Sequence, residues 1–557
     1  MSDQEGKSPF DLGQLREIVS SKRVTRRRVL QGAAAAGALA ALGPVASACG
    51  GTSDSGTSAS PSAASGPKKG GIIRAGMGGG SAKDTLDAHT ATNETQITLQ
   101  FQLYDSLMGF DEQSKLVMLL ADTYEASTDA TEHTVKLKSG LTFHDGSPVN
   151  ADSVVFSFQR IIDPKTASEG AAGLANLKPG NIKKVDDLTV TFVLDAPSAI
   201  FNEQLAYYNN AIVPVGYDPK GMDGAIGTGP WKVTSYAAGQ QAEFAANPDY
   251  WGTGPFADQL TLIEFPDPTA KLNALLGGTI DYANILDSAQ VSTVENTPGF
   301  KLVESKTGGW DPFTMRIDKK PFDDVRVRQA MRLIVDRQQM IDQAYGGNGW
   351  VGNDVYAPFD PGYPQDLAPR VQDLEQAKSL LKAAGYDNNL TVELNCSTAT
   401  GAADVQAAQV FSQQAKGAGV TIKVNKVDPS AFWNSGNYLS YPFAMTFWGT
   451  RNYLAQAQRG SLPAVGTSPS APYWGETAWK DAEWQKIFDE AIVTTDAAKR
   501  NELVSQLGRI DYDRGGYIIY QFNVMLDGYS DKLAGVVADA WGAESASKAR
   551  YNLMYFA

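Results

Sequence analysis

The clearest pattern of apolar and polar positions lies between residues 134 and 162. Polar and apolar side chains alternate over 134–138, which predicts a half-buried β-strand, and the short apolar stretch 141–143 predicts a second strand. The sequence His-Asp-Gly-Ser-Pro at 144–148 is typical of a turn, because Gly tolerates positive φ and Pro fixes φ. Asn150 can then cap a helix. The apolar face of this helix comprises Val154, Val155, Phe158, Ile161 and Ile162.

A β-strand, α-helix, β-strand unit is predicted farther along the chain. Residues 390–394 and 420–424 alternate as strands do, and a helical pattern near 403–416 lies between them. A crossover of this length is typical of two parallel strands. A further helix is predicted at 373–385, and a further strand at 188–194.

Two more helices follow from the spacing of apolar residues. One is predicted over residues 93–107. The other begins at Asp323 or Asp324, either of which can cap its first turn. The inner face of this second helix carries Ala330, Met331, Ile334, Val335 and Ile341.

The composition is that of a soluble globular protein, with 43% hydrophobic and 20% charged residues. A chain of 557 residues predicts more than one domain. The net charge of −14 argues against nucleic acid and against an anionic membrane surface as partners. Charge is unevenly distributed, since residues 1–48 carry seven basic and four acidic side chains.

The basic N-terminal region predicts an export signal over residues 1–48. Residues 25–31 resemble a twin-arginine motif, and an apolar run rich in Ala and Gly follows at 32–45. Small residues before Cys49 resemble the cleavage site of a bacterial lipoprotein, which would leave Cys49 acylated. A cleaved signal without lipid and an uncleaved anchor are the alternatives. Residues 49–67 are rich in Gly, Ser, Ala and Thr and predict a flexible, lipid-anchored tether.

Three longer motifs resemble segments of one known protein family, in the same order. They are LKSGLTFHDGSPVNADSVVFSFQRI at 137–161, GTGPW at 227–231 with NPDYWG at 247–252, and PFDDVRVRQA at 321–330. These motifs resemble family 5 solute-binding proteins, the peptide- and nickel-type receptors of bacterial ABC importers. The resemblance covers roughly residues 68–557.

The resemblance implies a two-lobed α/β fold of the periplasmic-binding-protein type (type II, the large oligopeptide-receptor class with an extra subdomain in lobe I). Lobe I would comprise residues 68–310 in two subdomains and the return segment 521–557, and lobe II residues 311–520. The lobes would close on a peptide or another small solute and deliver it to a membrane permease with separate ATPase subunits. The protein would be a monomer on the outer face of the cytoplasmic membrane, anchored there by lipid.

No motif indicates catalysis, a metal or a cofactor. His89, His133 and His144 are not spaced as metal ligands. A nucleophile elbow and a nucleotide-binding Walker loop are both absent from the sequence. Cys396 follows an apolar strand and is interpreted as a small buried hydrophobe. The sequence therefore predicts a binding protein rather than an enzyme.

The candidate ligand site lies after the apolar stretch that begins at Phe443 and ends at Trp448. In peptide-binding relatives, the position three after this Trp carries an Asp that receives the α-ammonium of the peptide. Here that position is Arg451, which pairs with a carboxylate or a phosphate and repels an ammonium. We therefore expect Arg451 to bind an anionic group, such as a peptide C-terminus or a sugar acid. The alternative is that Arg451 points to solvent or to an acid across the cleft.

Five further residues are candidate ligand contacts, because large rings and amides suit varied ligands. They are Trp448, Trp310, Tyr104, Asn452 and Gln521. Core packing is the alternative for each. Other functions also stay open: a receptor for a sugar acid, an oligosaccharide or a metal chelate, a sensor or chaperone without transport, and a secreted hydrolase.

Overall fold

The fold was analysed in a computed structural model of the chain. The described residues are 66–401, 403–434, 437–462, 474–542 and 550–557. The chain separates into two units between Ala64 and Ser65, and every described residue belongs to the second. The predicted signal, Cys49 and nearly all of the predicted tether lie outside the described residues.

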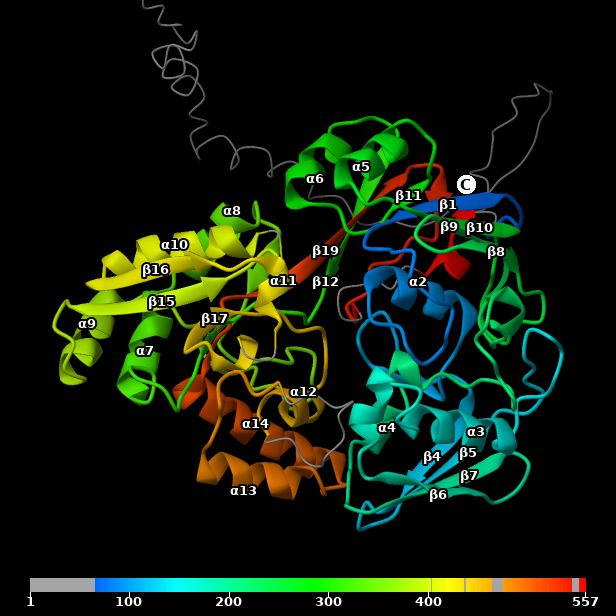
Figure 1. Cartoon of the computed structure of the whole chain (residues 1–557), viewed down its shortest axis with the longest axis horizontal. Helices are drawn as coiled ribbons and strands as arrows, with labels where there is room; N and C mark the ends of the chain where they lie inside the picture. The colour runs from blue at the N-terminus through cyan, green and yellow to red at the C-terminus, as the bar shows by residue number, and fades with distance from the viewer. Residues whose placement is uncertain (1–65, 402, 435–436, 463–473, 543–549) are drawn as a thin grey trace, which may run out of the picture. The chain divides into compact units, whose positions relative to one another are not determined.

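The largest sheet has eight strands and combines the two ends of the described chain (Figure 1). Its order is β12-β19-β11-β1-β10-β9-β8, and β14 also pairs with β19. Its strands are β1 (Ile72–Met77), β8 (Trp231–Ala237), β9 (Gln241–Ala246), β10 (Gln259–Glu264), β11 (Tyr282–Ala283), β12 (Phe300–Lys306), β14 (Gly349–Val351) and β19 (Gln521–Ser530).

A second sheet has five strands in the order β16-β15-β17-β13-β18. Its strands are β13 (Phe313–Met315), β15 (Leu390–Cys396), β16 (Val420–Lys426), β17 (Phe443–Met445) and β18 (Tyr517–Ile518). A third sheet has four, in the order β4-β5-β7-β6. These are β4 (Ala121–Ala126), β5 (Glu132–Leu137), β6 (Leu177–Lys184) and β7 (Thr189–Leu194). Two short pairs complete the described strands: β2 (Met108–Phe110) with β3 (Leu116–Met118), and β20 (Leu533–Ala534) with β21 (Tyr555–Phe556).

Helices cover these sheets and connect their strands (Figure 1). They are α2 (Glu94–Leu103), α3 (Ala151–Ile162), α4 (Phe201–Gln204), α5 (Pro268–Leu276), α6 (Ser288–Glu295), α7 (Val325–Ile334), α8 (Arg337–Ala344), α9 (Leu374–Ala383), α10 (Asp404–Lys416), α11 (Pro429–Phe432), α12 (Tyr453–Gly460), α13 (Ala482–Ala491) and α14 (Ala497–Arg514). Two 3₁₀ turns matter below: η1 (Glu169–Leu174) and η2 (Tyr208–Asn210).

Helix α3 forms as predicted because its N-terminus is fully capped. The Asn150 side chain accepts a hydrogen bond from the backbone of Ser153, and the Ser153 side chain accepts one from the backbone of Asn150. Phe158 is fully buried and meets Phe192 of β7 edge-on, with ring centroids 4.9 Å apart. The apolar face of α3 is thus fixed against the four-stranded sheet.

The predicted strand, helix, strand unit is also confirmed. Strands β15 and β16 are parallel and pair from Leu390 with Val420 to Cys396 with Lys426, and α10 connects them. Cys396 is fully buried at the end of β15.

Three predicted elements differ from the structure. The predicted helix from Asp324 through Ile341 is two helices, because Val335 is extended and the Asp336 side chain caps α8 by accepting the backbone N–H of Gln339. Asp324 caps only the first of them. The predicted strand 141–143 is a single bridge between Thr142 and Pro148. The predicted helix 93–107 ends at Leu103, because Tyr104 is extended.

If the short strand β14, which pairs with β19, is set aside, the chain passes twice between the eight-stranded and five-stranded sheets. The first passage connects β12 to β13, and the second leads from β18 to β19 through only Ile519 and Tyr520. The backbones of Trp310 and Trp448 pair across the first passage, with N–H···O distances of 3.0 and 2.9 Å. Strand β14 belongs to the eight-stranded sheet although its residues lie within the predicted lobe II, and the lobe boundaries stay a prediction.

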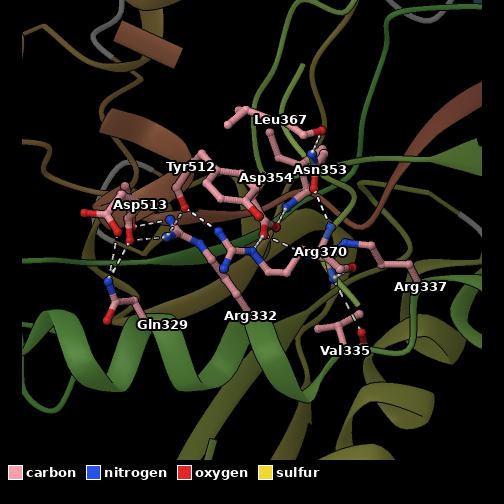
Figure 2. Close-up of polar contacts among 12 residues, drawn as sticks. Gln329, Arg332, Val335, Arg337, Asn353, Asp354, Leu367, Arg370, Tyr512 and Asp513 are labelled. Carbon is pink, nitrogen blue, oxygen red and sulfur yellow. Dashed lines mark hydrogen bonds and ion pairs between the residues drawn. The ribbon is translucent and has the colours of Figure 1, made fainter. Parts of the chain in front are cut away.

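A charged network lies beside the second passage (Figure 2). The Asp354 carboxylate is fully buried and accepts hydrogen bonds from Arg337 and Arg370, both at 2.7 Å. Its other oxygen accepts the backbone N–H of Ile519 at 3.0 Å. Nearby, the guanidinium of the fully buried Arg332 donates only to backbone carbonyls, among them that of Tyr517 at 2.9 Å. A buried carboxylate with two cationic partners thus links the start of the second passage to α8.

Candidate functional site

A cavity of ≈ 310 Å³ lies between residues from two distant parts of the sequence. Four lining residues come from the stretch 92–208 and ten from the stretch 399–476. The lining residues are Thr92, Glu169, Tyr207, Tyr208, Ala399, Trp433, Tyr438, Thr446, Phe447, Trp448, Arg451, Arg459, Trp474 and Glu476. Six Trp or Tyr rings, one Phe and two Arg side chains make this the kind of mixed apolar and polar surface that binds small solutes.

Trp448 forms a wall of the cavity directly after strand β17. Its side chain is 7% exposed, and its indole stacks on that of Trp310 with centroids 6.2 Å apart. Its indole N–H donates to Glu476 at 3.2 Å. The ring is therefore fixed on one side by stacking and on its edge by a hydrogen bond.

Glu476 fixes several side chains of the same cavity wall by hydrogen bonds. Its carboxylate accepts hydrogen bonds from the hydroxyls of Tyr438, Thr446 (2.9 Å) and Tyr517 (3.1 Å), besides that from Trp448. Burial raises the pKa of this carboxyl from 4.5 to about 7, although the four donors act in the opposite direction. Glu476 thus holds three lining side chains in place and is itself 4% exposed.

Two arginines supply positive charge to the cavity. Arg451 lies just before Asn452, the N-cap residue of α12. It is half-buried and places its guanidinium carbon 5.9 Å from the centroid of the Trp448 ring. Burial, and next the charge of Arg459, lowers the pKa of Arg451 to about 10, so it stays charged at neutral pH. Arg459 lies on α12, approaches Glu169 at 3.7 Å, and places its guanidinium carbon 5.8 Å from the ring centroid of Tyr207.

Glu169 and the tyrosine pair reach the cavity from the other part of the sequence. Glu169 is the first residue of η1, whose turn is capped by the Ser168 side chain. Tyr207 and Tyr208 follow α4 at the start of η2, with ring centroids 4.5 Å apart. The pair Arg459–Glu169 therefore connects the two groups of lining residues across the cavity.

The structure brings two of the predicted contacts, Trp448 and Arg451, to the cavity. Of the other four, none is among the described residues that line it. Trp310 is 1% exposed and stacks between Trp448 and Tyr356. Asn452 donates to Glu203 at 3.0 Å.

The two remaining predicted contacts lie in the eight-stranded sheet or next to it. The Tyr104 hydroxyl donates to the carbonyl of Leu86 at 2.7 Å, inside a hydrophobic core. Gln521 is 1% exposed on β19, opposite Val351. Their roles as ligand contacts stay predictions, as does lipidation of Cys49, which lies outside the described residues.

Sequence reasoning missed Arg459, Glu169 and Glu476. Arg459 could have been found, because it carries the same charge as Arg451 and follows it closely in the sequence. Glu169 and Glu476 gave no signal, since their place in the cavity depends on contacts between distant segments.

The histidines are structural in the described part of the chain. The Nε2 atoms of His89, His133 and His144 each bond to a backbone carbonyl, at 3.0, 3.1 and 3.0 Å. Among the residues that the structure describes, no group of three His, Cys, Asp or Glu side chains could hold a metal ion. No helix in the same residues is long and apolar enough to cross a membrane.

Comparison with known proteins gives one family and one fold. The family model "Bacterial extracellular solute-binding proteins, family 5 Middle" matches residues 115–466. The glutathione-binding protein GsiB of Pectobacterium atrosepticum is 29% identical over 482 residues, which cover 82% of this chain and 90% of that protein. The dipeptide-binding protein of Escherichia coli K12 is 26% identical over 469 residues, covering 79% and 87%.

A solved structure extends the likeness to three dimensions. The periplasmic binding protein DppA of Helicobacter pylori, in complex with the peptide STSA, matches with a TM-score of 0.70 and 20% identity. The match covers 88% of this chain and 98% of that one. The predicted two-lobed α/β fold is therefore confirmed.

Proposed function

This chain belongs to the bacterial extracellular solute-binding proteins of family 5, and we propose that it is the substrate-binding component of an ABC importer for a peptide or a similar small solute. The cavity carries this proposal, because its lining comes from both predicted lobes and combines aromatic walls with fixed charges. Closure of two lobes on a solute would bury it among these groups.

Two curated relatives support a peptide-like solute. One is named for glutathione and the other for dipeptides. A non-peptide anion is a second candidate, because Arg451 lines the cavity. In either case the solute-loaded form would be recognised by a membrane permease, with ATP hydrolysed by separate subunits.

A thermal-shift screen tests the proposal on the unit Ser65–Ala557, which is compact by itself. The panel contains short peptides with free or blocked ends, oligosaccharides, sugar acids and metal chelates. A solute at about 100 times its Kd should add about 2.7 kcal/mol of stability. Failure of every compound to shift a cooperative melting transition would contradict the proposal.

Two matched tryptophan variants locate the binding event. Trp433→Ala removes a half-buried ring from the cavity and should abolish the shift. Trp251→Ala removes a half-buried ring outside the cavity and should leave it intact. If both variants lose the thermal shift equally, the solute binds outside this cavity.

We also propose that the protein is anchored outside the cytoplasmic membrane through lipid on Cys49. The support is the order of basic residues, apolar run and small residues before Cys49. In cells that express the full chain, Cys49→Ser should move the protein from the membrane fraction to the soluble fraction. An unchanged distribution would exclude the lipid anchor.

A further inference from the structure

The two acidic residues in the described cavity lining already have partners. Glu169 pairs with Arg459 at 3.7 Å, across the two groups of lining residues. Glu476 accepts four hydrogen bonds, two on each oxygen. A carboxylate offers about four acceptor positions, so Glu476 has no position left for a ligand ammonium.

Among the described residues that line the cavity, four carry an ionisable charge. They are Arg451, Arg459, Glu169 and Glu476.

Arg451 and Arg459, the two arginines that line the cavity, can bind an anion. A guanidinium has five N–H donors, so an anion and groups of the protein can bind to it at the same time. Arg451 lies against the Trp448 ring and Arg459 against the Tyr207 ring, which restricts both guanidiniums to the cavity wall. Such a planar group can bind a carboxylate through two parallel hydrogen bonds.

We propose that the solute is an organic anion with a carboxylate and without a free ammonium group, such as an N-acylated peptide or a sugar acid. This inference rests on the proposed receptor function and names its solute class. The carboxylate binds Arg451, and the rest of the solute lies against the aromatic walls. A peptide with a free N-terminus is disfavoured, because its ammonium meets two arginines. Of the two acids in the described lining, Glu476 has no acceptor position left and Glu169 already faces Arg459.

Isothermal titration calorimetry on the unit Ser65–Ala557 tests this proposal about the charge of the solute, which we call the charge rule. The ligand is one tripeptide in four forms. The four forms combine a free or acetylated N-terminus with a free or amidated C-terminus. A sugar acid and the corresponding neutral sugar form a second pair, which distinguishes the two sources of the carboxylate. We expect acetylation to preserve or raise affinity and loss of the carboxylate to lower it roughly 10- to 100-fold, the range for a hydrogen bond to a charged group.

Three variants examine the charges separately. Arg451→Gln should lower affinity for the acid forms roughly 10-fold or more and leave the amidated forms unchanged. Glu169→Gln removes a negative charge from the cavity and should raise affinity for the acid forms. The control Arg509→Gln removes an arginine of the same kind, 44% exposed and paired with Asp366, and should change nothing. Thermal melts of each variant establish that it is folded.

The outcomes separate this inference from the receptor function. Tighter binding of the free-amine form than of the acetylated form, or equal binding of acid and amide, would overturn the charge rule and leave the receptor function standing. If no compound of either panel binds a folded protein, both proposals fail.

Discussion

Replacing Glu476 with glutamine should remove part of the pH dependence of folding stability. The variant keeps the size of the side chain and one acceptor oxygen for the indole N–H of Trp448, and its amide can donate to the hydroxyls of Tyr438 and Thr446. What it loses is a titratable carboxyl that is 4% exposed.

The sign follows from the raised pKa of this carboxyl. Its pKa rises from 4.5 in the unfolded chain to about 7 in the folded protein, chiefly through burial. The folded protein therefore binds more protons between these two values, so the stability that Glu476 contributes is fully present below pH 4.5 and is lost as the pH rises through 7. A shift of this size corresponds to about 3 kcal/mol, most of which falls between pH 5 and pH 8.

Urea-induced unfolding at pH 5 and pH 8, followed by tryptophan fluorescence, measures this difference. Glu476→Gln should match the parent at pH 5 and exceed its free energy of unfolding by about 2 kcal/mol or more at pH 8. The pKa of Asp511 is also raised to about 7, so only the difference between variant and parent isolates Glu476.

Two further variants complete this experiment. Glu476→Ala leaves four donors without their acceptor and should cost about 2–4 kcal/mol at pH 5. Glu125→Gln, at an exposed position, should follow the parent at both pH values. An identical pH dependence in Glu476→Gln and the parent would refute the raised pKa of this buried carboxyl.

Three other substitutions test the fold by the same unfolding assay. Asp354→Asn should lower the free energy of unfolding by about 3 kcal/mol, because two buried arginines lose their counter-charge. Asn tolerates the φ of +61° at this position, so the backbone is not strained by the change. The control Asp366→Asn, at a 72% exposed position, should change the free energy of unfolding by less than about 1 kcal/mol. Asn150→Ala should cost about 1 kcal/mol through loss of the α3 cap, and a change below the error of the assay would contradict the capping role. Phe158→Ala should cost about 3–5 kcal/mol, since it leaves a cavity against Phe192, and a smaller loss would mean that the neighbouring core collapses into the space.

Local patterns in the sequence were sufficient to predict those helices that have both a capping residue and regularly spaced apolar residues. Helix α3 was predicted from Asn150 onward because its capping residue and its apolar face lie within a few residues of each other, and the structure adds the reciprocal hydrogen bond that the Ser153 side chain accepts. The division between α7 and α8 was not predicted, because Val335 continues the apolar period of α7 while its backbone is extended. Apolar spacing alone could not detect that break, although Asp336 is a residue that favours a helix start.

The site was predictable only where a single segment carried it. Trp448 and Arg451 were found because both follow one strand, and Arg451 departs from the residue that the family resemblance implied. The opposite wall was not predicted, since Glu169 and Tyr207 precede Trp448 by more than 200 residues. Nothing in their local sequence indicates that folding brings them to the same cavity. Trp310 and Tyr104 were predicted as ligand contacts but are buried in the core. An aromatic residue that lies near the site in sequence can therefore be part of the core instead.

The place of β19 in the eight-stranded sheet affects when that sheet can form during synthesis. β19 lies between β12 and β11, yet it comprises residues 521–530 of 557, whereas the other strands of the sheet are complete by residue 351. A nascent chain that has reached residue 500 therefore holds β11 and β12 without the strand that joins them. Contacts between such distant segments form slowly, and unpaired strand edges are prone to aggregation. The sheet can become complete only when almost the whole chain has been made, so truncation before residue 521 should prevent folding of the N-terminal strands as well as removing the C-terminal ones.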